Sequence, residues 1–273
     1  MTKKRKKRRA APNRLLWIVL FVIAGIVTSK FITPAAGEST KYSCELAVPA
    51  FTTTPAKSQI IEHIGYIVSY NSSTKNPNWV GYELTAEETA GVVGREADFT
   101  CDHLVKGAQA IDYDYKNSGW DRGHMAPAAD MKWSKQAMEE SFYLTNVSPQ
   151  NQKLNRGVWK KLEELTRNRA ELYGSVIVIS GPIFNGTGQK SIGENRVKIP
   201  DAFFKVLLTD YNEKYRAIGF ICKNEAEKKR LKEYAMSIDD VEEITGLDFF
   251  TQLPDEVECK VECSFSAPFW GLQ

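Results

Sequence analysis

Residues 121–131 read DRGHMAPAADM, and residues 142–164 read FYLTNVSPQNQKLNRGVWKKLEE. The first stretch is a polar loop in which a glycine frees the backbone just before His124 and a proline stiffens the chain that follows. The second stretch opens a pattern that predicts an amphipathic helix over residues 154–172. Its apolar face consists of Val158, Leu162, Leu165 and Leu172. The two stretches therefore predict a histidine-bearing loop followed by a long helix.

On both sides of these two stretches and between them, short apolar runs and turn residues predict the other elements. Strands are expected at residues 61–70, 79–84, 142–145, 175–180, 202–209 and 215–222, and helices at residues 135–140 and 225–236. The run NSSTKNPN, residues 71–78, predicts the turn between the first two strands. Strands and helices are mixed without a regular βαβ alternation, so the expected fold class is α+β.

The first part of the chain has the pattern of a membrane-targeting segment. A basic run, KKRKKRR at residues 3–9, precedes an apolar stretch of 18 residues, 15–32, which would be about 27 Å long as a helix. Positive residues stay on the cytoplasmic side, so the rest of the chain is expected outside the cytoplasm, either periplasmic or extracellular. The prediction is a cytoplasmic tail at 1–14, a transmembrane signal-anchor at 15–32, a linker at 33–58 and a folded domain at 59–273.

Two alternatives remain for this region. Small residues after the apolar stretch leave open a cleaved signal. The basic run could also bind nucleic acid itself, although its position before an apolar span makes charge-guided topology the simpler account.

The distribution of charge excludes a domain that attracts polyanions over its whole surface. Nine of the 36 Lys and Arg residues precede Glu38, which leaves 27 basic residues against 34 acidic ones in the remainder. Any nucleic-acid site in the folded domain must therefore be a local basic patch.

The chain has five cysteines, an odd number that outside the cytoplasm allows at most two disulfides and one free thiol. Their spacing does not indicate a zinc site. Cys259 and Cys263 are near neighbours, and either could instead pair with Cys44, so the connectivity stays open.

The chain has three histidines, and His124 is the one whose sequence neighbours suggest a catalytic role. Asp121, Arg122 and Asp130 are expected to crowd its imidazole, where carboxylates can fix a tautomer and adjust basicity. Asp121 could equally be a turn or capping residue. The other two histidines, His63 and His103, are expected to be structural.

These motifs together carry a resemblance. DRGHMAPAAD and residues 142–164 resemble the signature blocks of the DNA/RNA non-specific endonuclease family, the ββα-metal (His-Me finger) nucleases such as Serratia nuclease and endonuclease G. In the second block an asparagine opens a helix and a glutamate follows eight residues later, and Asn155 and Glu163 have that spacing. Further similar runs are GREADFTCD (94–102), GPIF (181–184), IPDAFFKVLL (199–208) and VEEITGLDFFTQLPD (241–255). The resemblance covers about residues 60–258.

The resemblance implies an enzyme that hydrolyses DNA and RNA with Mg²⁺, or with Mn²⁺ or another divalent cation. It implies that His124 is the general base, that Asn155 binds the metal directly, and that Glu163 holds the metal through water. Phosphodiester hydrolysis needs these parts, because a water must lose a proton while positive charge offsets the charge growing on the phosphate. The implied fold is a ββα-metal domain with a mixed, largely antiparallel sheet.

Other residues are given supporting roles by the same resemblance. Arg95 would clamp the phosphate, Asn146 would support the site, and Asp121 would belong to the catalytic group. Arg122 would either touch substrate or brace the loop.

Each assignment has a plainer alternative. Arg95 could form a surface salt bridge, Asn155 or Asn151 could cap the helix, and Glu163 could lie on a solvated helix face.

For the whole chain, the alternatives are an inactive envelope binding domain and a phosphodiesterase for small nucleotides. DNA, RNA and the membrane are the expected partners, and no obligate protein partner is evident.

Overall fold

The computed structural model describes residues 43–273 except 54, 56, 96–97, 187 and 189. The expected cytoplasmic tail and membrane span, residues 1–32, lie outside the described residues. Of the helices that are described, none is both long enough and apolar enough to span a bilayer.

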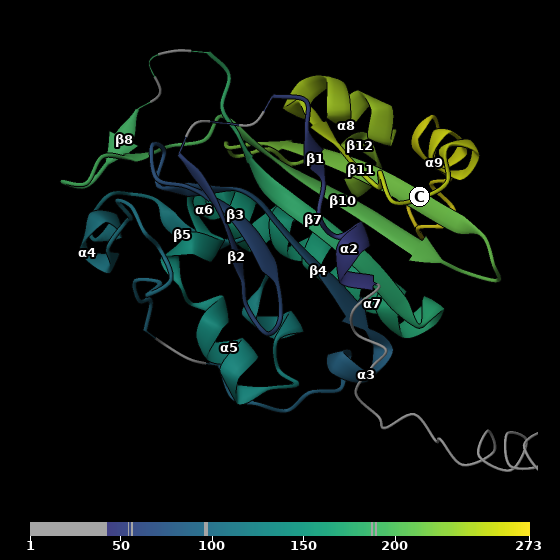
Figure 1. The fold of residues 1–273 in the computed structure, drawn as a ribbon, viewed down its shortest axis with the longest axis horizontal. Coiled ribbons are helices and arrows are strands. Elements are labelled where there is room, and N and C mark those ends of the chain that lie inside the picture. Colours follow the sequence, from purple (N-terminus) through teal and green to yellow (C-terminus); the bar gives the residue numbers. More distant parts are fainter. Residues whose placement is uncertain (1–42, 54, 56, 96–97, 187, 189) are drawn as a thin grey trace, which may run out of the picture. The chain divides into compact units, whose positions relative to one another are not determined.

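A seven-stranded sheet forms the centre of the fold, in the order β12-β11-β10-β7-β4-β3-β2 (Figure 1). Its strands are β2 Ser58–Glu62, β3 Ile67–Asn71, β4 Asn76–Thr85, β7 Ser175–Ile183, β10 Ala202–Asp210, β11 Tyr215–Lys223 and β12 Ala235–Met236. Every pairing within it is antiparallel. The α+β expectation is confirmed, and the sheet is wholly antiparallel rather than mixed.

Both faces of the sheet are covered, which explains why its central strands are apolar throughout. Successive side chains of a strand point to opposite faces, so Val176 and Val178 of β7 join one core while Ile177 and Ile179 join the other. Helix α7 (Lys160–Tyr173) packs into the first core. Helices α8 (Ile238–Thr245) and α9 (Asp255–Glu262) cover the second (Figure 1).

A separate two-stranded antiparallel sheet carries the histidine motif. It consists of β5 (Asp121–His124) and β6 (Val147–Gln150). The chain then enters a nearly continuous helical run of α6 (Gln152–Leu154), a π-helical turn η4 (Asn155–Trp159) and α7. The order strand, strand, helix is the one that the resemblance implied.

The helix predicted at 154–172 is present, but its apolar face is shorter than expected. Val158, Leu162 and Leu165 are buried, whereas Leu172 is 57% exposed in the last turn. The helix predicted at 135–140 is also present, as α5 (Lys135–Ser141).

Three predicted elements are wrong. The single strand expected at 61–70 is a hairpin, because the chain turns between β2 and β3. The strand expected at 142–145 is instead the end of α5 followed by a short helical turn, η3 (Leu144–Asn146). Its β pairing is limited to an isolated bridge between Tyr143 and Thr100. The helix expected at 225–236 is a loop, then η5 (Leu231–Glu233), then edge strand β12, since pairing with β11 outweighs local helix propensity.

Part of the expected linker at 33–58 is folded into the domain. It contains α2 (Ser43–Leu46) and β1 (Ala50–Phe51), and β1 pairs with β13 (Leu247–Asp248). The backbone at Ala47 packs directly against Gly81 of β4, where a Cβ atom would lie 1.8 Å from the carbonyl oxygen. The folded domain therefore begins before residue 59.

The remaining short elements are η2 Ala128–Asp130, α3 Ala86–Thr89, α4 Asp112–Tyr115, β8 Ser191–Ile192 and β9 Val197–Lys198.

Candidate active site

His124 lies at the end of β5 with its ring between two aromatic side chains. The ring centroid is 5.2 Å from that of Phe99 and 5.1 Å from that of Phe142, and the residue is 8% exposed. Burial, and then the positive charge of Arg95, lowers the pKa of His124 to about 3. Its Nε2 atom is buried and has no hydrogen-bond partner among the described residues. The ring is therefore neutral at physiological pH and has one nitrogen able to accept a proton.

Asn146 holds the chain that follows His124. Its side-chain amide donates to the carbonyl oxygens of Ala126 and Ser141, both at 2.8 Å, and its Oδ1 accepts from the Ala126 amide at 2.8 Å. Its own carbonyl oxygen accepts from the Met125 amide. A buried side chain satisfied in this way fixes the loop geometry, so Asn146 acts through the position of His124.

Gly123 has a role different from the one expected. Its backbone is an ordinary part of β5, with no positive φ. A Cβ atom there would lie 2.3 Å from Oε1 of Gln150. The glycine therefore makes room for a buried side chain of β6 rather than freeing the backbone beside the ring.

The helical run is tied to β5 at two places. Trp159 donates from its indole nitrogen to the carbonyl oxygen of His124 at 3.1 Å. Asp121 accepts a hydrogen bond from Nδ2 of Asn155 at 3.1 Å and two from Arg156 at 2.9 Å each. The start of the helix and the histidine strand are thus held as one unit.

The helix cap is Asn151, whose Oδ1 accepts from the amides of Lys153 and Leu154. Asn155 lies one turn further on, at the start of the π-helical turn. Its amide nitrogen faces Asp121, which leaves its carbonyl oxygen Oδ1 as the atom able to bind a cation. Single π-helical turns inside helices are frequent at functional sites.

Glu163 lies in the first turn of α7 and is half-buried rather than on a solvated face. Burial raises its pKa to about 7, Asp130 adds to the rise, and the charges of Lys205, Arg167 and Arg95 oppose it. A carboxylate partly withdrawn from water and poised near neutrality is suited to binding a cation or its waters.

Lys205 is a residue that the sequence patterns did not single out. It lies in β10 with 0% exposure, and its Nζ has no hydrogen-bond partner within the described part of the chain. The ammonium group is 4.7 Å from the centre of the Trp159 ring, and burial lowers its pKa. The available signal was a lysine inside the otherwise apolar run AFFKVLLT.

The expectation that Asp121, Arg122 and Asp130 crowd the imidazole is not met, because each has its partners elsewhere. Asp130 is buried and accepts from Arg167 and from the Tyr82 hydroxyl, both at 2.7 Å. Arg122 pairs with Asp112 at 2.6 Å and packs on aromatic rings. This geometry favours the bracing role for Arg122.

Arg95 is exposed and close to the histidine. Its guanidinium carbon lies 5.1 Å from the centroid of the Phe142 ring, the same ring that His124 contacts edge-on. Its charge acts on both His124 and Glu163. Among the residues that the structure describes, no carboxylate forms an ion pair with Arg95.

The residues present fit a hard divalent cation beside His124. Mg²⁺ prefers oxygen ligands and keeps several of its waters, and this site offers the Asn155 amide oxygen and the Glu163 carboxylate. Two positive side chains, Lys205 and Arg167, favour the ionised carboxylate without occupying it as ion-pair partners.

Comparison with known proteins identifies the family. The model of the DNA/RNA non-specific endonuclease family matches residues 48–256. The chain belongs to this family. The mitochondrial nuclease EXOG of Xenopus laevis is 34% identical over 218 residues, and the mouse EXOG is 32% identical over 265 residues. The alignments cover 74% and 88% of this chain but only 61% and 72% of those relatives.

A solved structure has the same fold. The structure of EndoG in a complex with EndoGI superposes with a TM-score of 0.70 at 29% sequence identity, and it covers 76% of this chain and 91% of that one. The family resemblance drawn from the sequence motifs is therefore confirmed.

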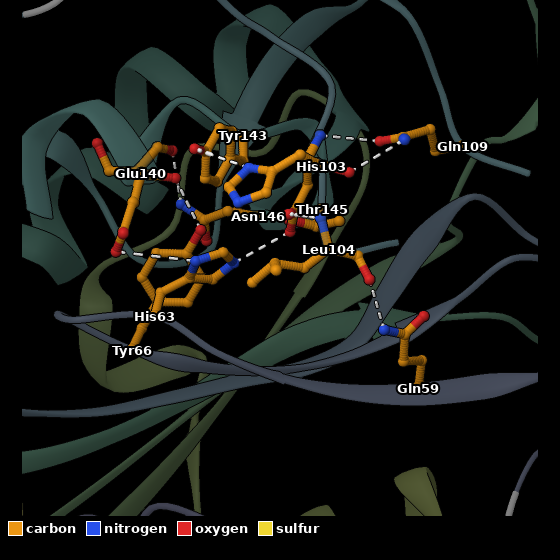
Figure 2. A network of polar contacts seen from close by, with 12 residues as sticks. Gln59, His63, Tyr66, His103, Leu104, Gln109, Glu140, Tyr143, Thr145 and Asn146 are labelled. Carbon is orange, nitrogen blue, oxygen red and sulfur yellow. Dashed lines mark hydrogen bonds and ion pairs between the residues drawn. The ribbon is translucent and has the colours of Figure 1, made fainter. Parts of the chain in front are cut away.

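A buried polar network supports the segment that carries Asn146 (Figure 2). His63 lies 3.0 Å from Asp102 through Nε2, and Thr145 donates to the same carboxylate at 2.9 Å. Burial alone would raise the pKa of Asp102, but its hydrogen bonds and the His63 ring outweigh burial and lower it. These contacts join the β2–β3 turn to η3, which fits the structural role expected for His63.

A basic groove adjoins the start of the helical run in this family member. It has a volume of about 990 Å³ and lies between η4 and the loop that precedes η5. Its charged lining residues are Lys153, Arg156, Lys161, Lys228, Lys229, Arg230, Glu227 and Glu233. This is the kind of local basic patch that an otherwise acidic domain needs to bind a polyanion.

Four cysteines with described side chains, Cys101, Cys222, Cys259 and Cys263, are free thiols. The side chain of Cys44 lies outside the described set.

Proposed function

We propose that the protein is a divalent-metal-dependent endonuclease that hydrolyses DNA and RNA with little regard for sequence. The observation that carries the proposal is the neutral, buried His124, whose Nε2 has no hydrogen-bond partner among the described residues. Its strand, β5, is hydrogen-bonded to the helical run that contains Asn155 and Glu163. Family membership supports the same activity.

In this mechanism His124 takes a proton from the attacking water, because its ring is neutral and has a nitrogen free to accept one. Arg95 binds the phosphate through its planar guanidinium group. Asn155 would bind the cation directly and Glu163 would hold it through water, while Asp121 keeps Asn155 in place. When bound there, Mg²⁺ or another divalent ion supplies positive charge where the phosphate becomes more negative.

The absence of sequence preference in this proposal has a physical basis. Contacts through a metal ion, Arg95 and a basic groove reach phosphates, and phosphate contacts carry no direct sequence information. The groove beside η4 provides such contacts over several nucleotides.

The deciding experiment is a digest of closed circular plasmid DNA and of RNA by the full chain with Mg²⁺, with a chelator control. Cutting of both substrates that stops with chelator supports the proposal. An intact circle together with hydrolysis of small nucleotide diesters would instead indicate a phosphodiesterase for small substrates. A wild-type protein that is inert with every divalent metal tested would indicate a binding domain.

We further propose that the nuclease domain is anchored in a membrane and faces away from the cytoplasm. The support is the charge asymmetry around residues 15–32, which lie outside the described structure. Protease added to intact cells, or to cells with a permeabilised outer membrane, should degrade the domain, and a released soluble form would indicate a cleaved signal. A domain protected until the cytoplasm is opened would contradict this topology.

A further inference from the structure

A second cluster of possible metal ligands lies between α8 and α9 (Figure 1). These two helices cover the core on the face of the sheet opposite α7. Asp239 and Glu242 belong to α8, and Glu262 is the last residue of α9. One carboxylate oxygen from each lies within 4.8 Å of the other two. The cluster shares no residue with the candidate active site.

Glu262 provides an independent sign that something is bound there. It is 7% exposed, and its Oε1 is buried with no hydrogen-bond partner among the described residues. Burying an unpaired carboxylate is costly, and buried carboxylates in proteins are normally paired or bind metal ions. Glu242, in contrast, already uses Oε1 to accept from the Phe249 amide at 2.7 Å.

The charges around Glu262 increase this cost. Burial raises its pKa to about 8, and four further carboxylates, Glu242, Glu258, Asp239 and Asp248, all act in the same direction. Glu242 is also raised, to about 7, by burial and by neighbouring acids. These four neighbouring carboxylates oppose ionisation of Glu262, so a bound cation would offset their repulsion and give its unpaired oxygen a partner.

We propose that Asp239, Glu242 and Glu262 bind a structural divalent cation, with Ca²⁺ as the best fit. All three ligands are carboxylates, which suit hard cations rather than zinc. Ligand oxygens at the 2.3–2.6 Å typical of Ca²⁺ are at most about 5 Å apart across the ion, whereas those of Mg²⁺ are at most about 4.2 Å apart. The three oxygens lie within 4.8 Å of one another, so Ca²⁺ can reach all of them whatever their spacing inside that limit.

An ion at this place would clamp α8 to α9. Both helices pack on the same core, through Ile238 and Val241 of α8 and Val261 of α9. Glu242 extends the clamp to the segment after β13 through its bond to Phe249. Binding of the ion is therefore expected to stabilise this face of the sheet and to leave phosphodiester hydrolysis unchanged.

The test measures the melting temperature of the full chain during a Ca²⁺ titration, in an Asn155→Ala background that weakens the other metal site. A saturable rise is expected, of about 5–10 °C when free Ca²⁺ reaches 100 times its dissociation constant. Calorimetric titration should give one Ca²⁺ per chain in this background, with weaker binding of Mg²⁺. A melting temperature unaffected by Ca²⁺ would overturn the proposal.

Two variants locate the site. Glu262→Gln should abolish the Ca²⁺-dependent rise while leaving the metal-free protein at least as stable as its parent, because the amide is close in shape to the carboxyl group and cannot ionise among the neighbouring acids. Asp239→Asn, at an exposed ligand, should weaken binding without affecting the core. Glu243→Gln, an exposed neighbour outside the cluster, is the matched control and should keep the full rise. An unchanged rise in Glu262→Gln would show that Ca²⁺ binds elsewhere.

Discussion

His124 is held in an apolar environment by Phe99 and Phe142, and its contribution to activity can be measured directly. His124→Ala should lower the rate of plasmid nicking by about 10²–10⁴-fold, the usual contribution of a general base. The substitution should leave the fold intact, since the strand is fixed by backbone pairing and by Trp159. His103→Ala is the control and should cut at the wild-type rate, because its exposed ring contacts Tyr143 edge-on and through a hydrogen bond to the hydroxyl, and within the described part of the chain it has no ring contact or hydrogen bond with His124.

The low pKa of His124 also predicts how stability depends on pH. The folded-state pKa is about 3 and the reference value is 6.5, so below about pH 6.5 the unfolded chain binds a proton that the folded ring does not. Stability is therefore lost progressively as the pH falls from 6.5 toward 3. Urea unfolding at several pH values should show this loss, and His124→Ala should show a smaller one. Equal pH dependence in the two proteins would contradict a buried, neutral ring.

Lys205 is expected to act on Glu163 through charge. Its ammonium group lowers the pKa of the half-buried carboxylate, so Lys205→Met should raise that pKa above its present value of about 7. More Glu163 would then be protonated at pH 7, and the midpoint of the pH–rate profile should move to higher pH, with activity recovering in alkaline buffer. Lys214→Met, at an exposed position immediately before β11, should leave the profile unchanged. An equal fall in activity at every pH would indicate a purely structural role.

At the scale of elements, the start of the catalytic helix depends on its bonds to β5. Asp121→Ala should raise the Mg²⁺ concentration needed for half-maximal activity by about 10–100-fold, the usual effect of removing a residue that orients a metal ligand. Arg156→Gln should have a smaller effect, because Asp121 would still accept from Asn155. Asp210→Asn, an exposed acid at the end of β10, serves as control. A normal Mg²⁺ requirement in Asp121→Ala would separate this aspartate from the metal site.

Element prediction succeeded where one pattern dominated and failed where tertiary contacts competed with it. The helix over 154–172 and the apolar strands β7, β10 and β11 follow from periodicity and apolar runs. The run at 142–145 is equally apolar, but it is buried as a helical turn because Asn146 draws the chain against residues 126 and 141. That preference depends on partners distant in sequence and leaves no local pattern.

At the scale of the whole molecule, the basic groove is expected to extend the contact with nucleic acid beyond the scissile phosphate. Lys153→Glu, Lys161→Glu and Lys228→Glu together should weaken DNA binding most at low salt. They should also reduce the slope of log affinity against log salt by about 0.9 for each phosphate that the variant no longer neutralises. Binding is measured in His124→Ala protein to prevent cleavage. The same change at Lys57, Lys75 and Lys135, which are outside the groove, is the control, and an equal weakening there would point to net charge alone.

The family, the α+β class and the candidate residues His124, Asn155 and Glu163 all follow from the amino-acid sequence alone. These depend on residue types at short fixed spacings, which local pattern carries. Only the tertiary structure decided that Asp121 binds Asn155, that the charge of Lys205 acts on Glu163, and that Glu262 meets Glu242. Such pairs are 20 to 42 residues apart, and their meeting depends on how sheet and helices pack, which no single stretch of chain specifies.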